Sequence, residues 1–222
     1  RRAGLQRAIR LGFRFMHAWL GTFRLVDVRL PSPEARDLPH PCVIIANHPT
    51  HLDITAILSW VPRSCTLVKP SIYRRWWLWP LMAGSGQLEG AGPHPLDGAR
   101  LVERAEARLR QGETVVVFPE GTRTEQGREM PFHSLAFEIA CRANVPVVPL
   151  RIRCEPPYLS KDRPMLLPPF PPPVLSVHVL EPLRPEAFGR DSRRLRERAR
   201  SLYTNGATPD RRECEPASSR TS

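Results

Sequence analysis

An apolar run that leads directly into a polar sequence constrains this chain more than any other feature. Residues 42–45 read Cys-Val-Ile-Ile, and residues 46–53 read Ala-Asn-His-Pro-Thr-His-Leu-Asp. The β-branched run between Pro41 and Pro49 predicts a short buried strand, so that His48 lies where this strand ends.

The five-residue spacing of His48 and Asp53 predicts a paired arrangement. We expect a helix over residues 51–60 with Thr50 as its N-cap, which places Asp53 in the first turn. A carboxylate there could hold the Nδ1 proton of His48 and present Nε2 as a base at the sheet edge. Two other interpretations stay open: a loop pair that satisfies only itself, and a metal site that adds His51. The metal site is the weaker one because no further Cys/His cluster supplies ligands, so we predict no metal.

A second apolar run ends in another polar turn. Residues 114–117 read Thr-Val-Val-Val and predict a strand, after which Phe-Pro-Glu-Gly-Thr-Arg occupies residues 118–123. Gly121 permits a tight turn in which backbone N–H groups and the Arg123 guanidinium can face an anion.

Three blocks together resemble a known family. Asn-His, four residues and Asp fill residues 47–53, Phe-Pro-Glu-Gly-Thr-Arg fills 118–123, and Val-Pro-Val-Val-Pro-Leu fills 145–150. In this order and at these separations they resemble the glycerolipid and lysophospholipid acyltransferases of the 1-acylglycerol-3-phosphate acyltransferase type, over residues 41–182. The resemblance implies a single α/β domain with a central mixed, largely parallel sheet flanked by helices.

The resemblance implies roles for the catalytic pair. His48 matches the general base that takes the proton of an acceptor hydroxyl, and Asp53 matches the carboxylate that orients it. The hydroxyl oxygen then attacks the thioester carbonyl of acyl-CoA or acyl carrier protein, so no Ser or Cys nucleophile and no cofactor besides the acyl donor is expected.

The resemblance also implies an acceptor site. In the family, the arginine of the Phe-Pro-Glu-Gly-Thr-Arg block and a separate lysine bind the phosphate of a lysophospholipid or related glycerolipid. The matching positions here are Lys69, Glu120, Gly121, Thr122 and Arg123. For Lys69, a solvent-exposed charge at a strand end is the alternative.

One block departs from the family. Family members usually carry an arginine at the end of a further block, which lies between the Asn-His block and the Phe-Pro-Glu-Gly-Thr-Arg block. This chain has Gly90 at that position. The departure puts the standard lysophosphatidate acceptor in doubt and favours a variant subgroup. The run at residues 151–161 resembles bacterial acyltransferases found with aryl-polyene or related fatty-acid-like pathways.

The amino-terminal segment suggests contact with a membrane. Residues 1–26 hold six arginines and no acidic residue, interleaved with large apolar side chains at three- and four-residue steps. This pattern predicts a basic amphipathic helix in the interface of an anionic membrane, at the cytoplasmic face of the inner membrane, with a peripheral or monotopic attachment. An ordinary helix packed on the domain is the alternative. The chain starts with arginine, so we expect that an upstream piece, with or without an anchor, has been removed.

Other segments complete the predicted organisation. The tryptophan-rich run at 73–82 suits either a membrane or acyl-chain contact or plain core packing. We assign residues 27–188 to the acyltransferase domain and 189–222 to a basic helix followed by a disordered tail, and we expect the polar loop at 125–129 to reach over the site. Further elements are expected as strands at 25–30, 65–68, 145–152 and 174–180 and helices at 96–111, 133–143 and 191–202.

Composition leaves two rival functions open. The chain has 222 residues and a net charge of +11, which fits an anionic membrane and would also fit nucleic acid. A basic nucleic-acid-binding protein is disfavoured because no nucleic-acid motif is present, and because the aromatic residues cluster beside arginines in segments that are better explained by contact with lipid. A catalytically inactive lipid-binding member of the family is disfavoured by the intact histidine, acidic and arginine positions. The five cysteines include no CxxC pair, which argues against a disulfide or zinc framework.

Overall fold

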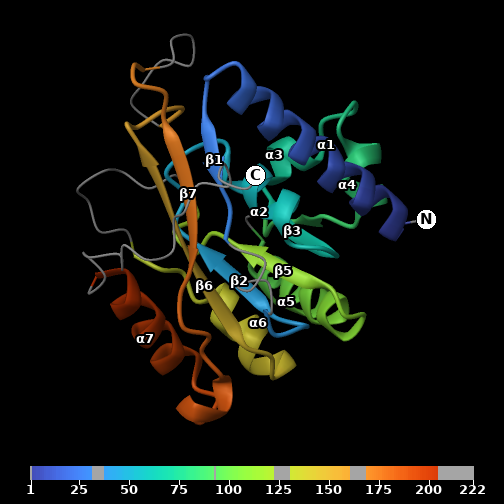
Figure 1. The fold of residues 1–222 in the computed structure, drawn as a ribbon. Helices are drawn as coiled ribbons and strands as arrows, with labels where there is room; N and C mark the ends of the chain where they lie inside the picture. Colours follow the sequence, from blue (N-terminus) through green and yellow to red (C-terminus); the bar gives the residue numbers. More distant parts are fainter. Residues whose placement is uncertain (1, 32–37, 93, 123–130, 161–168, 205–222) are drawn as a thin grey trace.

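The fold is built on one twisted sheet, seen in a computed structural model that describes residues 2–31, 38–92, 94–122, 131–160 and 169–204. Within these residues the sheet has seven strands in the order β1-β7-β6-β2-β5-β3-β4 (Figure 1). The strands are β1 (Asp27–Arg29), β2 (Val43–Ala46), β3 (Ser64–Val68), β4 (Leu88–Glu89), β5 (Thr114–Val117), β6 (Val147–Glu155) and β7 (Val174–Val179).

The strands that matter for function run in one direction. β2 pairs in parallel with β5 and β6, β5 pairs in parallel with β3, and β3 with β4. Only the β6–β7 pair is antiparallel, and β1 joins the far edge parallel to β7. The carboxyl ends of β2, β5, β3 and β4 therefore share one edge, where open α/β sheets place their ligands. The predicted mixed, largely parallel sheet is confirmed.

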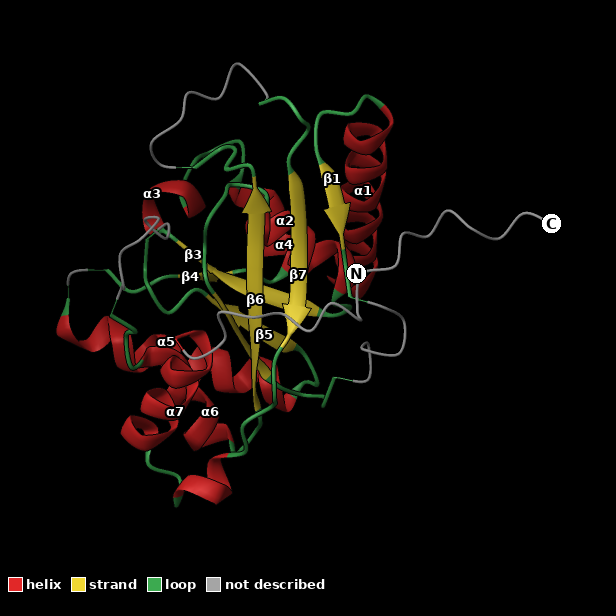
Figure 2. Ribbon diagram, turned by 60° about the vertical axis from the view of Figure 1, so that its left-hand side comes forward, coloured by secondary structure: helices red, strands yellow, loops and turns green. Residues whose placement is uncertain are grey.

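Helices cover both faces of the sheet, as Figure 2 shows. Alternate residues of β2 mark the two layers: Val43 and Ile45 pack with α5, α6 and α7, whereas Ile44 and Ala46 pack with α2. A strand buried on both faces must be apolar at every position, which explains the unbroken run. The helices are α1 (Arg2–Thr22), α2 (Asp53–Trp60), α3 (Pro70–Tyr73), α4 (Trp79–Ser85), α5 (Pro95–Arg110), α6 (Leu135–Ala143) and α7 (Ser192–Thr204), with a 3₁₀ turn, η2 (Pro185–Phe188).

Two predicted helix starts are wrong. The second helix begins at Asp53 rather than residue 51, and its N-cap is Leu52, not Thr50. The Thr50 hydroxyl donates to the Asp53 carboxylate instead of capping the helix. Similarly, α6 begins at Leu135 rather than residue 133. The helix ends were easier to predict, because a left-handed Asn144 (φ 51°) stops α6 as expected.

Helix α1 has a packed face and an exposed one. Its inner face contacts α2 and α4: His17 is buried and lies 3.0 Å from the Thr55 hydroxyl, and Gln6 donates to the Ser85 carbonyl oxygen at 3.0 Å. Its outer face carries an exposed stripe of large apolar side chains, Leu11, Phe15 and Trp19, which Phe23 extends just beyond the end of the helix. Packing on the domain therefore coexists with an apolar face turned to the outside, and the assignment of residues 1–26 to a membrane segment stays a prediction.

The tryptophan-rich run is not core. Trp76, Trp77 and Trp79 are exposed, Trp76 to 86 %, so the core-packing alternative is wrong for them. The predicted loop at 125–129 lies outside the described residues. The predicted disordered tail from Thr204 also lies outside them, except that Thr204 itself is the last residue of α7.

The core on the α6 side should carry much of the stability. Phe137 is fully buried there and stacks near Phe132, with ring centroids 6.4 Å apart. We expect Phe137→Ala to lower the free energy of unfolding by about 3–5 kcal/mol, because it removes apolar contacts and leaves a cavity. Urea denaturation followed by circular dichroism measures this, with Phe170→Ala as the control since Phe170 is 95 % exposed. Equal losses in both variants would contradict the assignment of the core.

Candidate active site

The predicted histidine–aspartate pair is formed. His48 follows β2 directly, and its Nδ1 lies 2.9 Å from Asp53 Oδ2 at the first residue of α2. The Asp53 side chain is completely buried, whereas the His48 side chain is 21 % exposed. A carboxylate accepts and does not donate, so Nδ1 carries the proton in this pair and the Nε2 side of the ring is the basic one.

A tight loop holds the aspartate in place. The Thr50 backbone N–H donates to Asp53 Oδ2 at 2.8 Å, and the Thr50 hydroxyl donates to Oδ1 at 2.9 Å. The same hydroxyl oxygen accepts from the Leu52 N–H at 2.8 Å, so Thr50 links both ends of the turn. Three donors, counting His48, point at the two oxygens of Asp53, which is the pattern an ionised carboxylate requires.

Asn47 fixes the point at which the histidine leaves the sheet. Its side-chain Nδ2 donates to the Ile152 carbonyl oxygen and its Oδ1 accepts from the Ile152 N–H, both at 2.8 Å. The last β2–β6 pair is Ala46 with Leu150, so the amide side chain replaces the next backbone pair of the ladder. The main chain can turn away at residue 47 without leaving Ile152 unpaired. Sequence reasoning gave Asn47 no role, although an amide next to a strand end was a usable signal.

The Phe-Pro-Glu-Gly turn after β5 lies next to His48 in space. β5 lies beside β2, and the Phe118 ring stacks on the His48 imidazole, with centroids 4.3 Å apart. Glu120 is buried, and Gly121 adopts a left-handed conformation (φ 66°). A Cβ at Gly121 would lie 3.2 Å from the ring of His133, so the turn and His133 are in close contact. Phe118 was missed because an aromatic residue at a strand end is usually core.

Tyr203 ties the last helix to the underside of the site. Its hydroxyl donates to the carbonyl oxygens of Ile45 at 3.2 Å and Leu150 at 2.9 Å, so one side chain clamps the ends of β2 and β6. Burial raises the pKa of Tyr203, as does the nearby charge of Glu120, and the phenol therefore stays protonated and a donor. No local sequence pattern indicated this contact, which joins residues about 158 positions apart.

The remaining predicted residues are placed as follows. Lys69 directly follows β3, on the same sheet edge, and is exposed; Thr122 is half-buried beside Gly121. Arg123 lies outside the described residues. The predicted role of Arg123 in binding the acceptor therefore stays a prediction.

Gly90 has a local structural reason. Its N–H donates to the Val68 carbonyl oxygen at 2.8 Å, and a Cβ at this position would lie 3.2 Å from that same oxygen. A larger residue would require the two strand ends to shift apart by a few tenths of an ångström. Close by, the Arg74 guanidinium pairs with the carboxylate of Glu89, so a cation reaches this corner from another segment.

No group of three or more His, Cys, Asp or Glu side chains within the described parts of the chain is arranged to hold a metal ion.

Burial of Asp53 raises the pKa of its carboxyl group, against the opposing effect of the hydrogen bonds from His48 and Thr50. The unfolded chain therefore releases this proton at a lower pH than the folded one. Above about pH 3.8, the reference pKa of an aspartate, the carboxyl group ionises first in the unfolded chain. The free energy of unfolding therefore falls as the pH rises, until the carboxyl group of the folded chain has also ionised.

Asp53→Asn should remove this pH dependence. We expect the free energy of unfolding of the variant, relative to the native chain, to rise as the pH is raised from about 3.8 and then to level off. Urea titrations at a series of pH values measure the difference, in which the groups that do not interact with Asp53 cancel. A difference that falls with rising pH would contradict the direction of the shift.

Comparison with known proteins places this geometry in a family. The sequence profile of the Acyltransferase family matches residues 28–153. A chloroplastic 1-acyl-sn-glycerol-3-phosphate acyltransferase of Brassica napus is 33 % identical over 127 residues, covering 55 % of this chain and 34 % of its own. The human 1-acyl-sn-glycerol-3-phosphate acyltransferase alpha is 34 % identical over 137 residues, covering 57 % and 46 %. The chain thus spans between about a third and a half of these relatives' lengths.

A solved structure has the same fold. The crystal structure of the 1-acyl-sn-glycerophosphate acyltransferase PlsC from Thermotoga maritima superposes with a TM-score of 0.70 at 22 % identity, covering 92 % of this chain and 79 % of its own. The family match covers more than half of the chain, including the strand ends that carry His48, Asp53 and Glu120. The chain therefore belongs to the acyltransferase family, as its three sequence blocks predicted.

Proposed function

We propose that this protein transfers a fatty acyl group from an acyl thioester, acyl-CoA or acyl carrier protein, to a hydroxyl of a lysophospholipid or related glycerolipid. The observation that carries the proposal is the His48–Asp53 pair at the carboxyl end of β2, held next to the turn at the end of β5. The relatives' names, which specify 1-acyl-sn-glycerol-3-phosphate as acceptor, support the substrate class.

The proposed reaction is one proton relay and one acyl exchange. His48 Nε2 takes the proton of the acceptor hydroxyl as its oxygen attacks the thioester carbonyl carbon. The C–S bond of the resulting tetrahedral intermediate then breaks, and the departing thiolate receives the proton from the imidazolium. Asp53 stabilises the imidazolium through the Nδ1 hydrogen bond. A base in this role contributes about a hundred- to ten-thousandfold in rate.

The environment of His48 suits this task. Stacking on Phe118 fixes the plane of the imidazole and covers one of its faces, and the Asp53 bond fixes its rotation, so the ring is oriented before substrate binds. Preorganisation of this kind removes a cost that the reaction would otherwise carry.

The acceptor's negative headgroup is proposed to lie along the sheet edge beyond Gly121. Lys69 at the end of β3 and Arg123 supply cations, Thr122 supplies a hydroxyl, and the buried Glu120 is proposed to orient the turn. Gly90 supplies no side chain to this site, and the nearby Arg74 is already paired with Glu89. The acceptor range should therefore differ from that of members with an arginine at this position, and the aryl-polyene subgroup stays a prediction.

The substrate is proposed to reach the site from an anionic membrane surface, at its cytoplasmic face. The exposed stripe of α1 and the exposed tryptophans after α3 offer apolar side chains, with arginines beside both. Aromatic residues of this kind sit at the headgroup level of bilayers. None of the helices in the described ranges has the length and apolarity to cross a bilayer.

Loss of the base should abolish transfer and leave the fold intact. We expect His48→Ala to lower turnover at least about a hundredfold, because no other described group replaces the imidazole beside Asp53. The assay follows a labelled acyl group from acyl-CoA or acyl carrier protein to a panel of lysolipids. The control is His51→Ala, which removes an exposed histidine of the same loop. Full activity in His48→Ala, or no transfer by the native chain to any lysolipid, would overturn the proposal.

Membrane binding should depend on the outer face of α1. We expect Phe15→Ser with Trp19→Ser to weaken binding to anionic vesicles at least about tenfold, since each large apolar side chain is worth about 1.5–3 kcal/mol when fully buried. Vesicle sedimentation measures the binding. The matched control, Leu96→Ser with Phe170→Ser, removes two exposed apolar side chains elsewhere. An equal loss in both pairs would count against a specific membrane face.

A further inference from the structure

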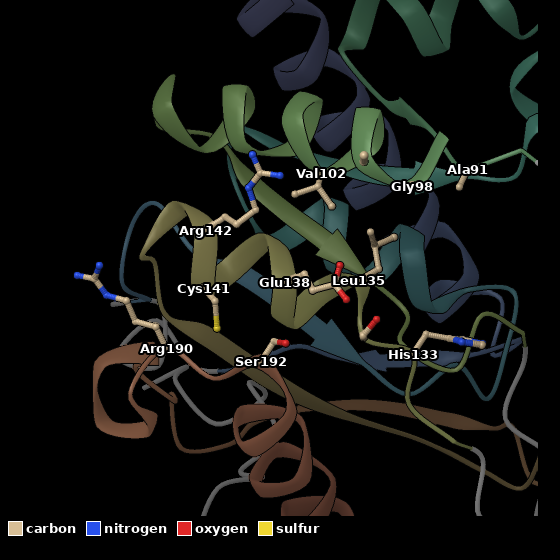
Figure 3. A pocket seen from close by; sticks show the side chains of 12 residues that line it. Ala91, Gly98, Val102, His133, Leu135, Glu138, Cys141, Arg142, Arg190 and Ser192 are labelled. Carbon is tan, nitrogen blue, oxygen red and sulfur yellow. The ribbon is translucent and has the colours of Figure 1, made fainter. Parts of the chain in front are cut away.

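A groove on the far side of the sheet from α2 has no role in the site described so far. It lies between α5 and α6 and reaches the start of α7, and its volume is about 700 Å³. Figure 3 shows His133 at one end and Arg190 at the other, with Leu135 and Glu138 between them. Val102 and Leu135 contribute apolar wall.

One end of the groove touches the candidate active site. His133 lines the groove, and its ring is in contact range of Gly121, next to the buried Glu120. The backbone N–H of His133 donates to the Pro119 carbonyl oxygen at 2.8 Å. This bond fixes the mouth of the groove to the turn that follows β5. Phe118, at the start of that turn, stacks on His48. A molecule lying in the groove would therefore present its end at the turn whose first residue, Phe118, stacks on His48.

The chemistry of the groove changes along its length. The Ser134 hydroxyl, next to His133, and the Glu138 carboxylate, nearer the middle, can accept hydrogen bonds. The far end carries the guanidinium groups of Arg142 and Arg190. Arg142 Nη2 lies 3.7 Å from Glu106 Oε2, and the Arg142 side chain is about half exposed. The guanidinium can therefore still reach an anion. The groove thus suits a slender molecule with amide N–H groups in the middle and a phosphate at its end.

From these observations, and on the basis of the proposed function, we infer that the groove holds the phosphopantetheine arm of the acyl donor. The arm's thioester end would lie by His133 and Gly121, its amide N–H groups would face Ser134 and Glu138, and its phosphate would lie between Arg142 and Arg190. Both acyl-CoA and acyl carrier protein carry this arm.

The dimensions agree with an extended chain. Leu135 and Arg142 are seven residues apart on α6, which corresponds to about 10 Å along a helix. His133 and Arg190 extend the groove further at both ends. A flexible arm of alternating amides and methylenes can lie along such a path.

The position of the groove favours the donor over the lipid acceptor. The exposed aromatic side chains proposed to face the membrane belong to α1 and to the segment between α3 and α4, and α1 packs against α4. The groove is formed by α5, α6 and α7, in the other helix layer. Donor and acceptor would then approach the His48 edge from different directions, which lets both occupy the site together.

Binding without turnover tests the inference. Isothermal titration calorimetry measures binding of the full chain to CoA, to holo-acyl carrier protein and to apo-acyl carrier protein. The three ligands show whether binding depends on the arm or on the molecule that carries it. The groove variants are Arg142→Ala with Arg190→Ala, which removes the cations, and Ala99→Phe, which fills the groove from an exposed position on α5. The control, Arg104→Ala with Arg193→Ala, removes the same charge from exposed positions that do not line the groove.

We expect the native chain to bind CoA and holo-carrier but not apo-carrier. The groove variants should weaken that binding at least about tenfold, because Arg142→Ala with Arg190→Ala removes charge-assisted bonds to phosphate and Ala99→Phe fills the groove. The control should not change the binding, because it does neither. Absence of binding by the native chain, unchanged binding in both groove variants, or equal binding of apo- and holo-carrier would overturn the inference.

The same measurements separate this inference from the proposed function. Groove-dependent CoA binding in a chain that transfers no acyl group would keep the arm site and refute the transferase. Acyl transfer whose donor KM is unchanged in both groove variants would keep the transferase and refute the arm site.

Discussion

The buried carboxylate of Asp53 is the constraint on which the rest of the site depends. A fully buried carboxylate is costly unless donors satisfy it, and three donors from Thr50 and His48 do so within one short loop. These bonds fix the turn between β2 and α2 and orient the imidazole at the same time. The same hydrogen bonds stabilise the fold and orient the histidine, because releasing the histidine would leave a buried charge short of a partner.

The sheet provides the second level of organisation. Parallel pairing of β2, β5, β3 and β4 brings His48, the Glu120–Gly121 turn, Lys69 and Gly90 to one edge, although they lie far apart in the sequence. Side chains then replace backbone pairing where the strands end. Asn47 continues the β2–β6 ladder, and the Tyr203 hydroxyl clamps the same two strands from α7. These hydrogen bonds hold the ends of β2 and β6 together at the edge that carries His48.

Features that depend on local sequence pattern could be predicted from the sequence. Contacts that depend on packing between distant segments could not. The apolar run before His48 identified its strand, and the five-residue spacing identified the pair with Asp53. Thr50 was misassigned as an N-cap because a hydroxyl before a helix usually serves the backbone, whereas here a buried carboxylate competes for it. Tyr203 and Phe118 act through contacts between distant segments, which no spacing rule reports. The groove between α5 and α6 likewise exists only after the layers assemble.

The central claim is that Asp53 holds His48 as a neutral base with its proton on Nδ1. Nitrogen-15 NMR of selectively labelled histidine measures this tautomer directly at a pH where the imidazole is neutral. The account predicts that His48 is protonated at Nδ1 and unprotonated at Nε2, and that Asp53→Asn disturbs this preference. A neutral His48 with its proton on Nε2 in the native chain would contradict the account.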